Sequence, residues 1–248
     1  MKQVSRLVLG LLVAAAGGAA LAQGQEPQSS LSFNVGVTTD YRFRGMAQTS
    51  TNPALQAGVD YAHKSGAYVG AWTSNVSWIK DYAGGTTGSL ELDLYGGYKG
   101  ELAKDVGFDV GLITYQYPGN DAPTNANTTE MYMALSYGPA TLKYSRALGN
   151  FIANPSSSGS AYLDLSASFE VAKGVTLTPH IGRQTVANVA NDAGDVTDLS
   201  LTLTHDYGNG LAVSLAASTT NGNRTFYTDS NGKFLGNNVV TLGVKYTF

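Results

Sequence analysis

The chain has no cysteine among its 248 residues, so no disulfide can hold the fold together and no thiolate can bind a metal. Its three histidines do not cluster in the sequence. The glycine pairs that begin at Gly84 and Gly96 are not followed by a predicted helix, which a phosphate-binding loop would need. We therefore expect no metal and no other cofactor.

Charge is also scarce. Only 13% of the residues are Asp, Glu, Lys or Arg, about half of the share usual in soluble domains. The formal net charge of -3 is acidic, whereas a nucleic-acid partner would require a basic surface. The composition therefore disfavours an ordinary soluble surface and argues against a protein that binds DNA or RNA.

Long hydrophobic runs are missing after Ala22, since no later segment approaches the roughly 18 apolar residues of a spanning helix. The beginning of the chain differs. Lys2 and Arg6 precede an apolar stretch at residues 7–16 and a small-x-small cleavage site that ends at Ala22. This order predicts a secretory signal peptide at residues 1–22, with an uncleaved N-terminal helix as the alternative. An exported chain of this kind is either a soluble protein or a β-barrel.

What the chain has in place of these features is strict alternation. Near its end every second residue is apolar, as in a strand with one apolar and one polar face. These residues are Val240, Leu242, Val244, Tyr246 and Phe248. A barrel in lipid has such faces and an aromatic rim, although the last strand of a soluble sandwich would show the same period. The terminal aromatic resembles the assembly signal of bacterial outer-membrane proteins, which implies Tyr246 and Phe248 as that signal and the barrel assembly machinery as a partner.

The same alternation recurs in about twelve segments. They cover residues 31–42, 54–63, 67–78, 89–99, 106–117, 129–137, 140–148, 161–171, 175–185, 198–206, 211–219 and 238–248. The segment at residues 175–185 is weak, because Pro179 cannot donate to a ladder. Short turns alternate with long polar connections, as periplasmic turns and outer loops do in outer-membrane barrels. We predict a polar leader at residues 23–30 and, at residues 31–248, an all-β transmembrane barrel that is antiparallel and up-and-down.

Aromatic side chains should lie on the outward face at both rims, where membrane interfaces favour them. At the periplasmic rim we expect Tyr61, Tyr68, Tyr98, Tyr137, Phe169, Tyr246 and Phe248. At the outer rim we expect Tyr41, Phe43 and Trp78. In the third segment the apolar, outward row is assigned to Tyr68, Trp72, Val76 and Trp78.

Several stretches of the first half have a family likeness. They are NVGVTTDYRFRGMAQ at residues 34–48, PALQAGVDY at 53–61, GAYVGAWTSN at 66–75, ELDLYGGY at 91–98 and YQYPG at 115–119. Together they resemble the TorF-type porin family of proteobacteria, a family of conserved outer-membrane proteins of unknown function. The resemblance implies an outer-membrane barrel with a pore role. It implies no established substrate and no catalytic residues.

These observations predict a channel for passive diffusion of small polar solutes or ions, with outer-membrane lipid around it. Twelve strands fall between the filled barrels of eight and the open channels of sixteen, so we expect a narrow polar lumen. A non-conducting barrel that acts through its loops as a receptor or adhesin is an alternative, although the loops have few anchoring aromatics. A hydrolase is the least supported reading, because only His180 should face the lumen and no serine motif accompanies it. We expect no enzymatic activity.

The inward row should bring charge into the lumen. The candidate pore-lining residues are Asp40, Arg42, Arg44, Glu91, Asp93, Asp109, Glu130, Lys143, Asp164 and His180. Near the outer mouth, the two arginines are predicted to face the carboxylates of Glu91, Asp93 and Glu130. Such a transverse field would orient dipolar solutes and sort ions by sign. In the alternative, Arg42 pairs locally with Asp40 and Arg44 is an ordinary loop residue.

Deletion of Phe248 is expected to reduce the amount of folded protein in the outer membrane. The residue ends the outward row at the predicted periplasmic rim, where an aromatic anchor is favourable. The conductance of each folded channel should not change. Heat-modifiable migration on gels measures the folded fraction, and a normal amount of folded protein after the deletion would refute the role in assembly.

Overall fold

The computed structural model describes residues 29–248, so the predicted signal peptide and most of the predicted leader lie outside the described residues. Strands make up most of the described chain. Its helical segments are α1 (Trp78–Asp81) and the 3-10 turn η1 (Ala190–Asp192). Within residues 29–248, no helix is long and apolar enough to cross a membrane.

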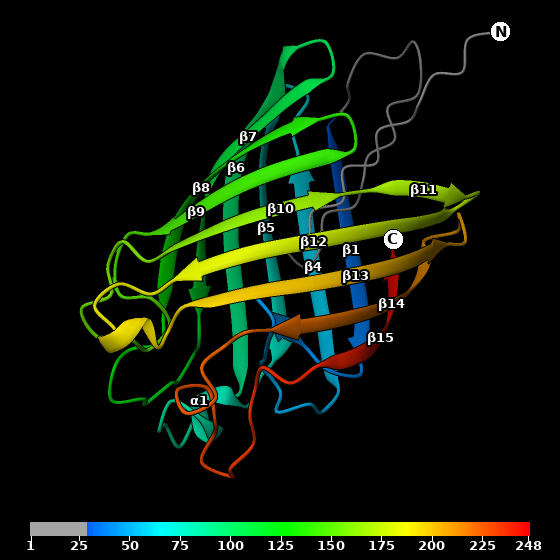
Figure 1. Cartoon of the computed structure of the whole chain (residues 1–248). Helices are drawn as coiled ribbons and strands as arrows, with labels where there is room; N and C mark the ends of the chain where they lie inside the picture. The colour runs from blue at the N-terminus through cyan, green and yellow to red at the C-terminus, as the bar shows by residue number, and fades with distance from the viewer. Residues whose placement is uncertain (1–28) are drawn as a thin grey trace, which may run out of the picture.

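The strands form a closed antiparallel barrel in which each strand pairs with its neighbours along the chain (Figure 1). They are β1 (Ser30–Thr38), β4 (Ala54–Ala62), β5 (Ala67–Asn75), β6 (Leu90–Ala103), β7 (Val106–Gln116), β8 (Thr128–Tyr137), β9 (Ala140–Ala147), β10 (Ala161–Ala167), β11 (Phe169–Ala172), β12 (Val175–Thr185), β13 (Val196–Asp206), β14 (Leu211–Thr220) and β15 (Val239–Thr247). β1 pairs with β15 and closes the ring. β10 and β11 together take one place in it, which gives twelve strands and confirms the predicted fold.

Pro179 lies at the centre of β12 and explains why the eighth strand is split. The pairing of β12 with β10 ends where His180 faces Ser166, and pairing with β11 begins where Leu177 faces Phe169. Proline has no N–H to donate to this ladder. On its other side β12 pairs with β13 without interruption. The segment that looked weakest in the sequence is therefore a strand of the barrel wall.

Long and short connections lie at opposite ends of the barrel (Figure 1). The long connections are residues 39–53, 76–89, 117–127, 148–160, 186–195 and 221–238, and the short turns are residues 63–66, 104–105, 138–139, 173–174 and 207–210. This arrangement follows the alternation of connection lengths in the sequence. The two ends are called here the long-loop end and the short-turn end.

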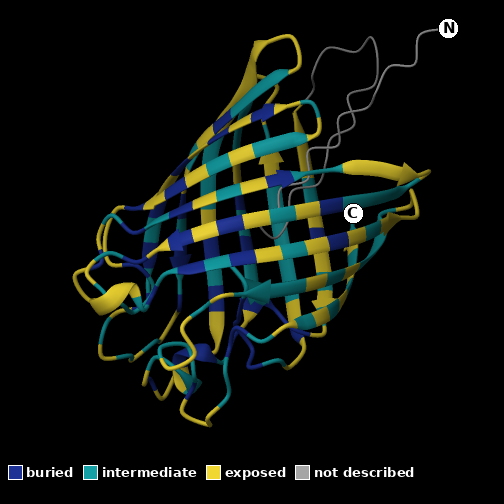
Figure 2. Cartoon of the chain, viewed as in Figure 1, coloured by how far each residue is buried: buried dark blue, intermediate teal, exposed yellow. Residues whose placement is uncertain are grey.

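The outward rows are apolar and exposed, and bands of exposed and less exposed residues alternate along the strands (Figure 2). On β1, for example, the outward Leu31 and Phe33 are 58% and 49% exposed. The inward Asn34, which follows Phe33, is 6% exposed. The aromatics expected at the short-turn end are also exposed, with one exception. They are Tyr61, Tyr98, Tyr137, Phe169, Tyr246 and Phe248.

The aromatic girdle predicted for the long-loop end is wrong. Tyr41 and Trp78 are buried, with 8% and 3% of their surface exposed. The ring of Phe43 packs against the inward Tyr115, with ring centroids 5.4 Å apart. The rings of these three side chains fill space inside the barrel. Side chains of the outward row point away from that space and cannot fill it.

The predicted outward row of β5 is wrong as well, including Tyr68. Trp72 is 2% exposed, and the hydroxyl of Tyr68 donates to Asp109 on β7 across the interior. The outward row is the other one, to which the 57% exposed Val69 belongs. Val76 and Trp78 lie beyond the end of the strand. Both rows of β5 are largely apolar, so alternation of hydrophobicity could not show which row faces outward.

Several inward tyrosines lie against glycines of the neighbouring strand. Tyr95 is paired with Gly70, where an added Cβ would be 2.5 Å from the ring. Tyr132 is paired with Gly111, where an added Cβ would be 2.4 Å from the hydroxyl oxygen. A glycine lets a large ring approach the backbone of the wall. These pairs give a structural reason for the abundance of both residue types, Gly 30 and Tyr 15.

Gly111→Ala is expected to lower the free energy of unfolding by about 1–3 kcal/mol, as overpacking commonly does. The added Cβ would also lie 2.6 Å from the carbonyl oxygen of Gly96, which cannot move away. Gly149→Ala is the matched control, because nothing lies within 4 Å of its Cβ position. The temperature at which heat-modifiable migration is lost measures the effect, and equal temperatures for the two variants would contradict this packing argument.

Candidate functional site

Loop 1, residues 39–53, folds into the long-loop end of the barrel. Its centre is a hairpin of β2 (Arg42–Phe43) and β3 (Met46–Ala47). The turn between them consists of Arg44 and Gly45, whose φ angles of 48° and 79° are both positive, as a two-residue hairpin turn of type I′ requires. A Cβ on Gly45 would lie 2.3 Å from Cγ2 of Thr220 on β14. The hairpin tip therefore reaches β14 and, through Asp198, β13.

Arg44 at the hairpin tip is held by groups from several strands. Its guanidinium forms an ion pair with Glu130 on β8 at 2.6 Å and donates a hydrogen bond to Oε1 of Gln184 on β12. It also lies 4.4 Å from the centroid of the Tyr162 ring and 5.4 Å from that of Phe151. Burial alone would lower the pKa of Arg44, but the Glu130 carboxylate raises the pKa above its ordinary value. Arg44 therefore stays charged inside the barrel.

Arg42 ties loop 1 to loop 6, residues 221–238. It forms an ion pair with Asp40 at 2.7 Å and donates hydrogen bonds to the carbonyl oxygens of Leu235 and Asn237, at 2.6 and 3.3 Å. Burial raises the pKa of Asp40, and the Arg42 guanidinium opposes that shift. Lys233 of loop 6 in turn donates to the carbonyl oxygen of Ser50. The two loops are thus fastened together across the mouth.

The two arginines have different partners. Arg44 reaches the Glu130 carboxylate on the far wall, whereas Arg42 pairs locally with Asp40. Neither arginine has a salt bridge to Glu91 or Asp93 among the described residues. Both arginines belong to loop 1 and not to the first strand, which ends at Thr38. One sequence-based alternative had the arginines facing carboxylates across the lumen, which Arg44 does at Glu130. The other had Arg42 pairing with Asp40, which it does. The role of these residues in permeation stays a prediction.

A group of buried carboxylates lines the interior of β6 and β8. Glu91, Asp93 and Glu130 are 1%, 3% and 0% exposed. Glu91 accepts a 2.8 Å hydrogen bond from the hydroxyl of Tyr41. Each of the three carboxylates nevertheless keeps one buried oxygen without a hydrogen-bond partner. Such oxygens are costly to bury, and their lone pairs stay available to a hydrogen-bond donor or a cation.

A second polar cluster surrounds His180 on β12. Its Nε2 lies 2.8 Å from Asp164 Oδ2, and its Nδ1 lies 3.4 Å from Asp198 Oδ2. The hydroxyl of Tyr162 donates a 2.9 Å hydrogen bond to Asp198. Among the described residues, no serine hydroxyl is a hydrogen-bond partner of His180, and no group of His, Asp or Glu is arranged to hold a metal ion. The cluster has the geometry of a buried ion-pair network and lacks that of a nucleophilic triad.

The remaining predicted residues also face the interior. Asp109 accepts the 2.6 Å hydrogen bond from Tyr68, and the Lys143 ammonium lies 4.1 Å from the centroid of the Tyr132 ring. Sequence reasoning missed Gln184 and Asp198, although each alternates with outward neighbours and could have been found. Of the inward rings, alternation places Tyr95 on the same row as Glu91 and Asp93, whereas Tyr68 and Trp72 were assigned to the outward row, because an apolar side chain by itself suggests the lipid face.

Carboxylates outnumber cationic groups in the described interior. The inward carboxylates of the strands are Asp60, Glu91, Asp93, Asp109, Glu130, Asp164 and Asp198, with Glu101, Glu170 and Asp206 exposed at the short-turn end, and the inward cations of the strands and hairpin tip are Arg44, Lys99, Lys143 and Lys245. Arg42 and Asp40 form their own pair. The interior is therefore acidic, and its long-loop end is occupied by loop 1 and by rings from the walls.

Comparisons with known proteins agree with this fold. A family model described as "Bacterial protein of unknown function (Gcw_chp)" matches residues 22–248. No curated protein is similar in sequence to the chain. The structure described as "KdgM porin" has a TM-score of 0.57 and 8% identity, and covers 89% of this chain and 99% of that chain.

Two further solved structures are similar to the same extent. One is described as "KdgM porin in complex with disordered oligogalacturonate", with a TM-score of 0.56, 7% identity and coverage of 89% of this chain and 99% of that chain. The other is a NanC porin, with a TM-score of 0.56, 10% identity and coverage of 88% and 99%. The shared feature is the porin-like outer-membrane barrel fold.

Arg44→Met and Glu130→Gln are each expected to destabilise the protein by about 3–5 kcal/mol, because each leaves a buried charge without its partner. The double variant should lose less than the sum of the two. Urea unfolding of protein inserted in lipid vesicles measures these free energies. The matched control is the pair of Arg183 and Asp195, whose side chains are 47% and 14% exposed. Removing the ion pair of Arg183 and Asp195 should lower the free energy of unfolding by about 0–1 kcal/mol. If the double variant of Arg44 and Glu130 lost the full sum of the two single losses, their contact would not contribute to stability.

Proposed function

This chain belongs to the bacterial family of unknown function described as Gcw_chp. From its closed barrel and polar inward rows we propose that it is an outer-membrane channel for passive diffusion of small polar solutes or ions, with a preference for cations. The proposal includes export by the N-terminal signal peptide and assembly in outer-membrane lipid. It also includes the finer assignment to the TorF-type porins. No enzymatic activity is part of it.

The exposed outward rows support the membrane location. Leucine, valine and aromatic side chains with 37–71% exposure surround the barrel, and lipid would cover them, whereas water would not favour so large an apolar surface. The polar inward rows supply a path for solutes. Because loop 1 and the inward rings occupy part of the interior, that path is narrow.

The buried carboxylates of Glu91, Asp93 and Glu130 are the observation that carries the preference for cations. Their unpartnered oxygens attract positive charge, and Arg44 neutralises only part of it. One of the similar structures is described as a complex with oligogalacturonate, which is a polyanion. An acidic interior would repel such a ligand, so we propose small cations and neutral polar solutes for this chain.

A barrel that does not conduct and acts through its loops is the second candidate. It is favoured by the contacts that fasten the long-loop end: the hydroxyl of Ser50 in loop 1 lies between Asp81 at 3.1 Å and Asp229 of loop 6 at 3.2 Å, and its one proton is shared between these two acceptors. Recording in planar lipid bilayers separates the two candidates, because a barrel closed by these contacts would give no current.

Replacing Arg42 and Arg44 together with Ala is expected to move the reversal potential in a salt gradient towards stronger cation preference. Replacing Glu91 with Gln and Asp93 with Asn should move it the other way. A unit charge about 4 Å from an ion changes its energy by roughly 1 kcal/mol in water, which corresponds to about a fivefold change in permeability ratio. If both double variants keep the wild-type selectivity, these residues do not form the filter.

A further inference from the structure

Inward serines are buried on one wall of the barrel and partly exposed on the other. Ser74 on β5, Ser136 on β8, Ser145 on β9 and Ser166 on β10 are 1%, 8%, 4% and 7% exposed. Ser200 on β13 and both Ser214 and Ser218 on β14 are partly exposed. The side chain and the face of the sheet are the same in all of them. The difference in exposure therefore shows that more groups cover the serines of the first wall than those of the second.

Large groups lie in front of the wall formed by β5 to β10. Its inward rows carry the rings of Trp72, Tyr95, Tyr115, Tyr132 and Tyr162. Loop 1 packs against this wall. The Tyr41 ring, for example, packs on Trp72 with centroids 5.3 Å apart, and Arg44 lies over Tyr162. Rings and loop together leave little free space on this side of the lumen.

The wall formed by β13, β14, β15 and β1 carries small inward side chains. They include Ala212, Ser214, Ala216 and Ser218 on β14, Thr241 and Gly243 on β15, and Gly36 on β1. All of these residues are partly exposed, although they face the interior of a closed barrel. Loop 1 contacts this wall at the long-loop end, where Gly45 approaches Thr220 and Asp198 and where Thr39 is hydrogen-bonded to Leu242 on β15.

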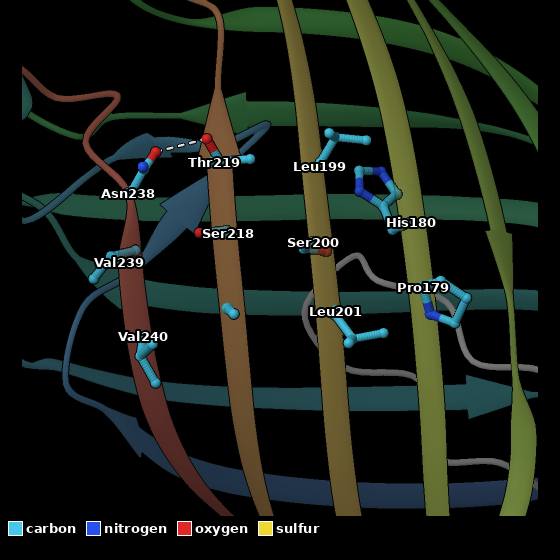
Figure 3. A pocket seen from close by; sticks show the side chains of 11 residues that line it. Pro179, His180, Leu199, Ser200, Leu201, Ser218, Thr219, Asn238, Val239 and Val240 are labelled. Carbon is cyan, nitrogen blue, oxygen red and sulfur yellow. Dashed lines mark hydrogen bonds between the residues drawn. The ribbon is translucent and has the colours of Figure 1, made fainter.

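The outer face of β12 to β15 carries a hollow. This pocket of about 650 Å³ is lined mainly by outward residues, among them Pro179, Leu201, Ala217 and Val240, which are neighbours across the four strands (Figure 3). The inward Ser200 and Ser218 also border it. Small side chains on both faces, Ala217 outward and Ser200 and Ser218 inward, therefore make the wall thin here.

From this asymmetry we infer that solutes cross the barrel off its axis, along the wall of β13, β14, β15 and β1. The inference rests on the proposed channel function and specifies the solute path within it. The path is lined mainly by hydroxyl groups and backbone. The charged groups beside it are Asp198 on β13, Lys245 on β15 and Asp60 on β4, two strands away from β15, and one oxygen of Asp60 has no hydrogen-bond partner.

This lining fits a small hydrated cation or a small neutral polar solute. Hydroxyl and carbonyl oxygens can replace part of the water around a cation, and the carboxylates of β6 and β8 across the lumen supply the attractive potential. The Lys245 ammonium opposes entry of cations at the short-turn end unless Asp60 balances it. Two carboxylates, Asp60 and Asp198, and one ammonium, Lys245, therefore border the path, and the rings of the far wall only limit its width.

The absence of cysteine makes the inference directly testable, since each Ser→Cys variant has a single thiol. The experiment compares Ser214→Cys and Ser218→Cys with the matched controls Ser136→Cys and Ser145→Cys. Each variant is inserted in lipid vesicles and treated with a cationic or an anionic methanethiosulfonate. Mass spectrometry then measures labelling, and planar-bilayer recording measures current before and after treatment. Heat-modifiable migration checks that every variant is folded.

We expect labelling at residues 214 and 218 to be at least about tenfold faster than at residues 136 and 145, because a thiol must be exposed to react. The cationic reagent should react faster than the anionic one. Labelling at residues 214 and 218 should also reduce the current, whereas the control variants should keep it.

The outcomes separate the two proposals. Equal labelling of both walls, or faster labelling at residues 136 and 145, with normal current would overturn the off-axis path and leave the channel in place. Fast labelling at residues 214 and 218 in a barrel that never conducts would overturn the channel and, with it, a solute path along this wall.

Discussion

Every strand of the barrel must pair on both sides, and this requirement shapes the rest of the molecule. The register of β1 with β15 joins the two ends of the sheet, so no row of backbone N–H and C=O groups is left open. Even Pro179, which cannot donate, is accommodated by a break in its neighbour and not by loss of the strand. With the backbone satisfied within the ring, the outward side chains are free to be apolar.

Closure also creates an interior that must be filled. The rings that lie on glycines of neighbouring strands fill part of it, and loop 1 fills another part at the long-loop end. Arg44 connects the two, because its guanidinium contacts a carboxylate, an amide and the Tyr162 ring of the wall, and also the Phe151 ring of the connection at residues 148–160. Packing and charge therefore concentrate on one side, and the opposite wall keeps small side chains.

Much of the wall could be predicted from the sequence, because strand period and turn residues are local signals. The segment at residues 175–185 coincides with β12, and alternation placed Glu91, Asp93 and Glu130 on the inward face correctly. Alternation failed on β5, where both rows are largely apolar. It also could not show that Tyr41 and Phe43 enter the barrel, since the groups that hold them come from strands far away in the chain.

The inserted hairpin has a consequence for the order of assembly. Arg42 is bonded to a carbonyl 193 residues later in the chain, and Arg44 to a side chain 140 residues later. Contacts of such sequence separation form late, after the costly loop closures. Loop 1 therefore cannot acquire all of its native partners until the C-terminal strands are in the ring. The first loop of the chain is therefore among the last parts to become ordered. A hairpin of β2 and β3 in its native position indicates that the barrel is complete.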